Sequence, residues 1–109
     1  MNELNEVMKE IIAFRDERDW QQFHNSKDLA IAINSEAAEL LNLFLWKNSE
    51  DVSVDRLKEE LADILIFCLY MADKHQLDVK QIILDKIQMN QEKYPANKSR
   101  GSATKYTDL

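Results

Sequence analysis

Apolar side chains recur at every third or fourth position through most of this 109-residue chain, which is the spacing of helices that bury one face. The pattern predicts four helices separated by short polar connections. They lie around residues 3–12, from about Asp28 to Trp46, from Ser53 to about His75, and from Asp78 to about Tyr94. We therefore expect an all-α protein built as a four-helix bundle.

Residues that cap helices stand at the predicted boundaries. Asn25 or Ser26 is expected to cap the second helix and Ser53 the third, and Asp78 opens a capping-box pattern for the fourth. Pro95 disfavours helix at the residue before it, and the chain beyond it is rich in Ser, Lys and Thr. The sequence thus predicts one helical domain over residues 1–95 and an irregular C-terminal tail over residues 96–109.

Composition supports a helical, ordered chain. A single Gly and a single Pro leave little turn punctuation, which argues against a protein rich in β-hairpins. Apolar residues make up 45% of the chain, too large a share for disorder along its whole length. The net charge of -6 disfavours nucleic-acid backbones and anionic membrane surfaces as partners, since both attract basic proteins.

The lone cysteine and the N-terminal residues indicate a cytoplasmic protein. Cys68 has no partner for an internal disulfide and stands in an apolar run, so we expect a buried structural thiol in a reducing compartment. The first residues lack the basic and apolar regions of a signal peptide. No segment approaches the roughly 18 apolar residues of a membrane span.

Carboxylates interrupt the apolar stripes of the second and third helices. Glu36 falls in the middle of a stripe, and Glu39 follows three residues later. Glu60 and Asp63 flank the stripe of the third helix at the same spacing, on a face that continues into Phe67 and Tyr70. The two stripes consist of Leu29, Ala32, Ile33, Leu40 and Leu43, and of Leu57, Leu61, Ile64, Leu65 and Cys68.

The two acidic pairs meet if their helices pack antiparallel. Four ionised carboxylates at close quarters repel one another, so the arrangement makes sense mainly with divalent cations, and oxygen-only ligands point to Mg²⁺ or Mn²⁺. The alternative is that Glu39, Glu60 and Asp63 are ordinary solvated groups. The third helix is apolar nearly all round beyond Asp63, which predicts that a second subunit covers this flank.

The fourth helix carries polar residues on the face expected to be buried. That face consists of Val79, Ile82, Ile83 and Ile87, and Lys86 and Asn90 project from the same side. A cation and an amide that face a metal site suit a phosphorylated ligand, although Lys86 can also snorkel to solvent. Flat surfaces for a base or sugar are offered by Trp20, His24, Phe44 and Trp46, whose alternative role is plain core.

Other metal and phosphate chemistries are disfavoured. Neither His24 nor His75 has an acidic residue three positions before it, as Glu-x-x-His di-iron sites require. Gly101 is the only glycine, so no glycine-rich phosphate loop exists, and no Ser-His-Asp or Cys-His arrangement suggests itself.

The spacing Glu36-x-x-Glu39, then Glu60-x-x-Asp63, resembles the signature of the all-α nucleoside triphosphate pyrophosphohydrolases, the MazG-like superfamily. Within it, the dCTP pyrophosphatase subgroup is the most similar. Further matching segments are Arg15-Asp16-Glu17-Arg18-Asp19-Trp20, Phe23-His24, Leu43-Phe44-Leu45-Trp46-Lys47, Asn90 with Lys93-Tyr94-Pro95, and Lys105-Tyr106-Thr107-Asp108-Leu109.

The resemblance implies Mg²⁺-dependent hydrolysis of a deoxynucleoside triphosphate, with dCTP or a related pyrimidine nucleotide preferred, to the monophosphate and pyrophosphate. Broad base preference and a non-catalytic, nucleotide-sensing oligomer are the alternatives. It also implies a homodimer or a dimer of dimers with sites at subunit contacts. The implied roles are metal binding by Glu36, Glu39, Glu60 and Asp63, proton transfer by Glu36 or Glu39, base and sugar contacts by Trp20, His24, Trp46 and Asn90, and phosphate contact by Lys86.

Overall fold

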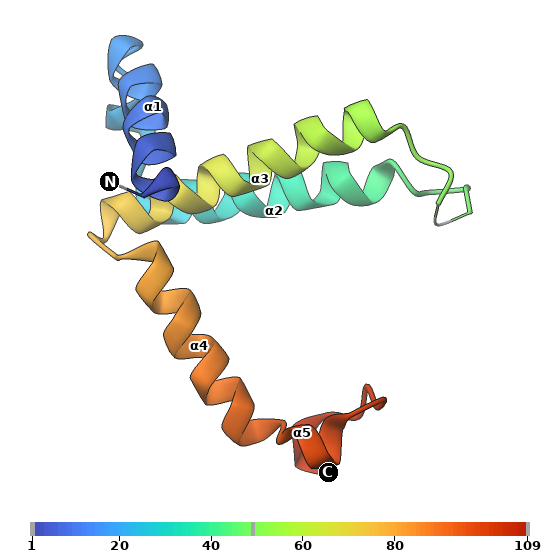
Figure 1. Ribbon diagram of the computed structural model, residues 1–109. Helices are drawn as coiled ribbons and strands as arrows, with labels where there is room; N and C mark the ends of the chain where they lie inside the picture. The colour runs from blue at the N-terminus through green and yellow to red at the C-terminus, as the bar shows by residue number, and fades with distance from the viewer. Residues whose placement is uncertain (1, 49, 109) are drawn as a thin grey trace. The chain divides into compact units, whose positions relative to one another are not determined.

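The computed structural model is all-helical and describes residues 2–48 and 50–108 (Figure 1). It forms two compact units, residues 1–77 and 78–109, which we describe separately; the predicted boundary at residue 95 falls inside the second. Met1 and Leu109, the ends of two segments discussed above, lie outside the described residues. The elements are α1 (Glu3–Glu17), η1 (Gln21–Phe23), α2 (Ser26–Asn42), α3 (Val54–Lys74), α4 (Val79–Lys93), α5 (Ala96–Ser99) and η2 (Tyr106–Asp108).

Most predicted caps are confirmed. The Asn25 side chain accepts a hydrogen bond from the Asp28 backbone N–H at 2.8 Å, so Asn25 rather than Ser26 caps α2. Asp78 caps α4 by accepting from the backbone N–H of Gln81 at 3.0 Å. The capping box is only half formed, because the Gln81 amide donates to Asp85 instead of reaching back.

The second helix ends earlier than predicted. It stops at Asn42, four residues before Trp46, and the chain then continues in turns. Trp46 has a φ of 65° and a fully exposed side chain. A bulky residue with positive φ is a genuine outlier, and such strain is typical of functional segments.

The first unit packs α1 against an α2–α3 hairpin. The two long helices run antiparallel, as the acidic pairs required, and α1 contacts α3 near its C-terminal end (Figure 1). Leu29, Ile11 and Tyr70 form the core cluster, with Leu29 only 2% exposed. The predicted stripe of α2 is confirmed, since Leu29 and Leu43 are buried and the rest of it is half-buried.

Two polar contacts join α1 to α3. The Tyr70 hydroxyl donates to the Ile11 carbonyl at 2.7 Å. The buried Arg15 guanidinium donates to Asp16 at 2.9 Å and to Asp73 at 3.2 Å. A buried cation needs paired acceptors, so these two carboxylates make the burial of Arg15 tolerable.

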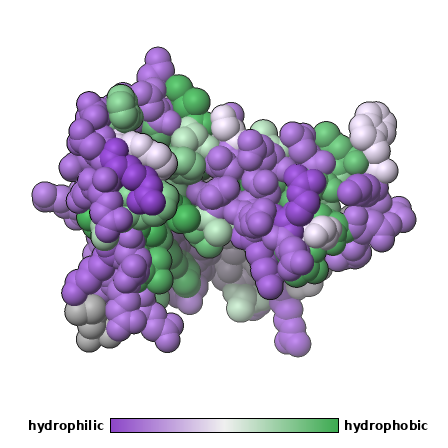
Figure 2. Space-filling model, turned by 90° about the horizontal axis from the view of Figure 1, so that it is seen from above, coloured by the Kyte–Doolittle hydropathy of each residue, from purple (hydrophilic) through white to green (hydrophobic). Residues whose placement is uncertain are grey.

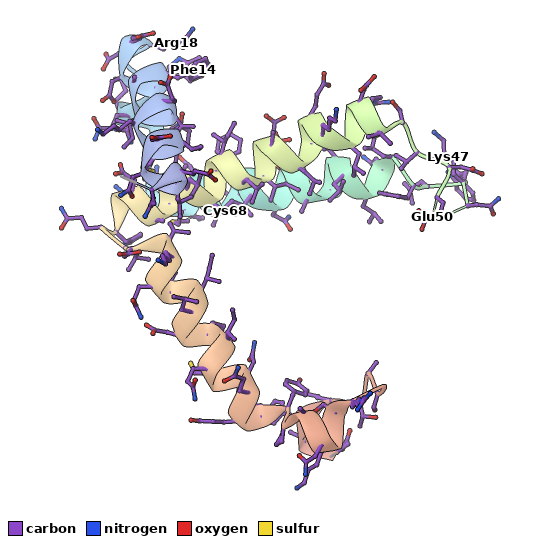
Figure 3. The ribbon with its side chains drawn as sticks, viewed as in Figure 1. Phe14, Arg18, Lys47, Glu50 and Cys68 are labelled. Atoms are coloured by element: carbon purple, nitrogen blue, oxygen red, sulfur yellow. The ribbon has the colours of Figure 1, made fainter. Side chains whose placement is uncertain are left out.

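The expected burial of the third and fourth helices is confirmed only in part for a single chain, since Leu57, Ile64 and Val79 are half-buried. Leu61, Leu65 and Cys68 are exposed, because α3 turns Tyr70, Ala72 and its neighbours inward instead. Figure 3 labels Cys68 on α3. In the second unit Ile82, Ile83 and Ile87 are likewise exposed. Figure 2 shows apolar side chains interrupting the hydrophilic surface.

The C-terminal tail is more regular than predicted, since it contains α5 and η2. The rings of Tyr94 and Tyr106 meet edge to face at 5.8 Å, and the Lys93 ammonium lies 4.8 Å from the centre of the Tyr106 ring. These contacts fold the tail back onto the end of α4, which the composition of the segment does not reveal.

Replacing Tyr70 by Phe is expected to lower the free energy of unfolding by about 1–3 kcal/mol, because the buried Ile11 carbonyl loses its tyrosine hydrogen bond. Urea titration of both proteins measures the difference. Tyr94→Phe is the matched control, with an expected change below about 0.5 kcal/mol. Equal stability of Tyr70→Phe and wild type would contradict this account of the α1–α3 contact.

Candidate metal centre and adjoining cavity

Three carboxylates from two helices converge on one point. Glu36 comes from α2, and Glu60 and Asp63 come from α3. One oxygen from each side chain lies within 4.8 Å of the others, a separation that a single cation can bridge. The antiparallel hairpin creates this cluster, because it places the middle of α2 opposite the first half of α3.

Burial leaves two of these oxygens without a partner. The Oε2 atoms of Glu36 and Glu60 are buried and accept no hydrogen bond from any residue that the structure describes. Burial, followed by the neighbouring Glu39, Asp63 and Glu60 carboxylates, raises the pKa of Glu36 to about 7. Burial and Glu39 also raise the pKa of Glu60. Orphaned, mutually repelling oxygens fit a divalent cation, which removes both penalties.

Glu39 stands beside this cluster but outside the three-residue set. Its carboxylate is exposed, and its negative charge helps to raise the pKa of both Glu36 and Glu60. The structure thus brings all four predicted carboxylates together, and Glu36, Glu60 and Asp63 form the tighter set. Metal binding by Glu39 stays a prediction.

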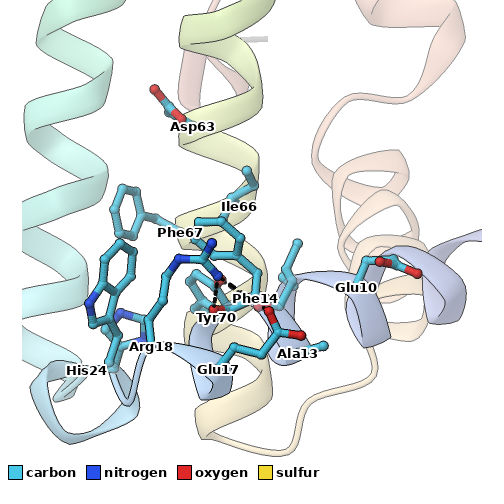
Figure 4. Close-up of a pocket in the computed structure, with 12 residues that line it drawn as sticks. Glu10, Ala13, Phe14, Glu17, Arg18, His24, Asp63, Ile66, Phe67 and Tyr70 are labelled. Atoms are coloured by element: carbon cyan, nitrogen blue, oxygen red, sulfur yellow. Dashed lines mark hydrogen bonds and ion pairs between the residues drawn. The ribbon is translucent and has the colours of Figure 1, made fainter.

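A cavity of about 650 Å³ lies between α1 and α3 and reaches Asp63 of the carboxylate cluster (Figure 4). Asp63 belongs to both features, and the same face of α3 continues to Phe67 and Tyr70, as the sequence indicated. The lining consists of Glu10, Ile11, Ala13, Phe14, Glu17, Arg18, Trp20, His24, Asp63, Ile66, Phe67 and Tyr70.

The end of α1 sets the position of Trp20. The backbone N–H of Trp20 donates to the Arg15 carbonyl, and the backbone N–H of Asp19 donates to the Asp16 carbonyl. Asp19 has a φ of 53°, in the left-handed region. This is the Schellman ending of a helix. It folds the chain back, so that the Trp20 ring meets the edge of Phe14 at 5.7 Å.

His24 completes the aromatic wall. Its ring lies 4.9 Å from that of Tyr70, and its buried Nδ1 atom has no hydrogen-bond partner in the described part of the chain. Burial lowers the pKa of His24, and the positive charges of Arg15 and Lys74 lower it further. The imidazole is therefore neutral at pH 7 and has an unpaired nitrogen, which suits a polar ligand group.

Phe44 and Trp46 are not among the residues that line this cavity, and Lys86 and Asn90 belong to the second unit, which is described by itself. Trp46 lies in the connection between α2 and α3, fully exposed, and half-buried Phe44 precedes it there. Lys86 and Asn90 stand four residues apart on one face of α4, both exposed, in the second unit. Their roles stay predictions.

Sequence reasoning missed several cavity residues. Phe14, Glu17 and Arg18 line it, although they read as the plain end of an amphipathic helix. Figure 3 labels Phe14 and Arg18 near one another, at the C-terminal end of α1 and just beyond it. The sequence feature that could have indicated them is the segment from Arg15 to Trp20, in which five charged residues of both signs stand immediately before an aromatic residue.

The fold and the site define a class: an all-helical protein in which carboxylates of an antiparallel helix pair form a candidate metal centre beside an aromatic cavity. The MazG-like family matches residues 31–109, and the chain belongs to that family. The matched range includes Glu36, Glu60 and Asp63, the acidic residues of the candidate centre.

Known proteins similar to this chain carry pyrophosphatase names. dCTP pyrophosphatase 1 of Bos taurus is 40% identical over 97% of this chain and 68% of its own length. The Homo sapiens protein of that name is 34% identical over 97% and 67%. A crystal structure of a pyrophosphatase from Archaeoglobus fulgidus superposes with a TM-score of 0.81 at 32% identity, covering 87% of this chain and 94% of that one.

Proposed function

We propose that this protein is a nucleoside triphosphate pyrophosphohydrolase that depends on Mg²⁺, or alternatively Mn²⁺, and prefers dCTP or a related pyrimidine deoxynucleotide. It hydrolyses the bond between the α and β phosphates, giving the monophosphate and pyrophosphate. The observation that carries the proposal is Asp63, which belongs to both the carboxylate centre and the aromatic cavity. Family membership and the names of the relatives support the same reaction.

The four carboxylates have different roles in the proposed reaction. Glu36, Glu60 and Asp63 hold the cation, which when bound supplies Lewis-acid chemistry and offsets phosphate charge. Glu39 lies next to this set, and its carboxylate is exposed. We therefore assign to Glu39, in preference to Glu36, the role of accepting the proton of the attacking water. Lys86 contacts a phosphate and Asn90 the sugar.

The cavity holds the base. Along α3, Asp63, Phe67 and Tyr70 follow at one-turn intervals, so the aromatic wall starts roughly 6 Å from the metal ligand. That separation leaves room for a sugar between the phosphates and the base.

Product analysis tests the proposed reaction. Purified protein is incubated with each deoxynucleoside triphosphate and Mg²⁺, and the products are separated by chromatography. Monophosphate with pyrophosphate is the expected result, with dCTP giving the highest kcat/KM. Diphosphate with phosphate would indicate hydrolysis at a different bond, and equal rates for all bases would replace the pyrimidine preference with a broad one. Binding without turnover would favour a nucleotide sensor.

We also propose a homodimer or a dimer of dimers. Exposed apolar side chains recur on both long helices, including Ile31, Leu41, Leu61 and Leu65, each between 44% and 61% exposed. A surface of that kind is typical of a subunit contact. The fully exposed, strained Trp46 then serves the site of the partner subunit.

A cytoplasmic location stays a prediction from the sequence. The helices that the structure describes include none with the length and apolar character needed to cross a bilayer.

Mixing two inactive variants tests whether Trp46 acts across subunits. Glu36→Gln and Trp46→Ala are each expected to be impaired, and hybrids of the two contain one site with an intact set of carboxylates and an intact partner tryptophan. Random exchange of subunits should restore about a quarter of wild-type activity, because half of the dimers are hybrids with one working site. No recovery after verified exchange would place Trp46 in its own subunit's site or outside any site.

A further inference from the structure

Arg18 places a flat cation inside the aromatic cavity. Its guanidinium carbon lies 3.7 Å from the centre of the Phe14 ring and 6.0 Å from that of Trp20. One nitrogen, Nη1, donates to the Phe14 carbonyl at 2.9 Å. Stacking on Phe14 and this hydrogen bond fix the plane of the group, so its remaining N–H bonds point in defined directions.

The free donors of Arg18 stand next to an acceptor. Within residues 2–48 and 50–108, its Nη2 atom donates no hydrogen bond, and Nη1 uses one of its two N–H bonds for the Phe14 carbonyl, which leaves donors on both nitrogens. Glu17 places Oε2 3.7 Å from Nη1 and also lines the cavity. Both side chains keep solvent access, with 41% and 73% of their surfaces exposed. A ligand can therefore reach both groups (Figure 4).

The pair presents two donors followed by one acceptor. The two donors belong to one rigid guanidinium, so the carboxylate stands at the end of the set and never between them. The pairing edge of cytosine has the complementary order, because O2 and N3 accept and the N4 amino group donates. Uracil and thymine have a donor at N3 between two acceptors, so their N3–H would face an N–H of the guanidinium, and two donors cannot form a hydrogen bond.

We propose that Arg18 and Glu17 together read the cytosine edge of the substrate, Arg18 by donating to O2 and N3 and Glu17 by accepting from N4. The inference rests on the proposed function and adds to it the residues that select cytosine over uracil and thymine. Bidentate pairing of arginine with two adjacent acceptors is a strong and directional contact in base recognition. In effect the pair imitates the pairing edge of guanine.

Variants of each residue test the assignment. Arg18→Gln and Glu17→Gln should each lower kcat/KM for dCTP by about 10- to 100-fold and change that for dUTP by less than about threefold. The ratio of kcat/KM for dCTP to kcat/KM for dUTP should therefore fall in both variants. Glu6→Gln and Lys9→Gln are the matched controls for Glu17→Gln and Arg18→Gln, because they remove a charge of the same sign from α1 at positions that do not line the cavity. Both controls should retain the wild-type ratio.

Substrate analogues test the same contacts in the unaltered protein. Wild type should hydrolyse the triphosphate of a deoxycytidine analogue with carbon in place of N3, or with hydrogen in place of the N4 amino group, about 10-fold or more slowly than dCTP. Glu17→Gln should lose its sensitivity to removal of the amino group, and Arg18→Gln its sensitivity to the N3 replacement.

The possible outcomes separate this inference from the reaction itself. An active wild type whose rates ignore both analogues, or variants that lower dCTP and dUTP hydrolysis equally, would overturn the base-reading role and leave the pyrophosphohydrolase intact. A wild type that hydrolyses no deoxynucleoside triphosphate would overturn both. Loss of the dCTP preference in the variants, together with matched loss of analogue sensitivity, supports the inference.

Discussion

Glu36→Gln is expected to lower kcat/KM by roughly 10³-fold. The amide keeps the shape of the side chain but removes the charge from one of three clustered oxygens. A bound cation supplies several kcal/mol of transition-state stabilisation, and each ~1.4 kcal/mol corresponds to a factor of ten in rate. Steady-state kinetics with dCTP at several Mg²⁺ concentrations measures the loss.

A neighbouring carboxylate provides the control. Glu59→Gln makes the same chemical change on α3, at an exposed side chain outside the cluster, and should retain activity within about twofold. Glu39→Gln should lower kcat while it leaves the Mg²⁺ dependence nearly unchanged, as expected of a proton acceptor. Full Mg²⁺-dependent activity in Glu36→Gln would refute the metal centre as assigned.

In EDTA, the protein is expected to lose stability as the pH rises from about 4.5 to about 7. The pKa of Glu36 is about 7 when folded, against 4.5 for an unperturbed carboxyl group, so the folded state holds this proton more tightly. Stability is therefore full below pH 4.5, and it falls until Glu36 is ionised. The decrease is on the order of 2 kcal/mol, discounted for partial exposure and screening.

Mg²⁺ should reverse this loss above pH 7, because it binds the ionised carboxylates of the folded state. The gain reaches about 2.7 kcal/mol when the free cation is at 100 times its Kd. Thermal unfolding with Mg²⁺ or EDTA, at pH 5 and pH 8, measures both effects. Glu36→Gln should show a smaller pH dependence and little response to Mg²⁺. An equal response in wild type and Glu36→Gln would contradict the proposed centre.

Element boundaries followed from local chemistry. Asn25, Ser53 and Asp78 each accept a backbone hydrogen bond at the start of a helix, as their positions in the sequence predicted. Their partners are only three residues away, so no distant contact is needed to recognise them. The end of α2 was harder to predict, because residues 43–46 keep an apolar pattern that a helix or a turn can equally accommodate.

The acidic signature was also readable. Glu36 interrupts an apolar stripe, and each acidic pair keeps one-turn spacing, so an antiparallel hairpin was enough to bring the four carboxylates together. Burial was a poorer prediction. Hydrophobic periodicity reveals that a face is apolar without revealing what covers it, and Cys68 and Ile83 are exposed in this chain.

By itself, then, the sequence determined the helical class, the helix starts and the identity of the acidic centre, since all of these depend on spacing along one or two helices. Only the tertiary structure decided the cavity. The Schellman turn at Asp19 returns Trp20 to Phe14, and the packing of α1 on α3 sets Arg18 and Glu17 along the same hollow as Asp63. Such proximity depends on how distant segments fold together, which local spacing does not encode.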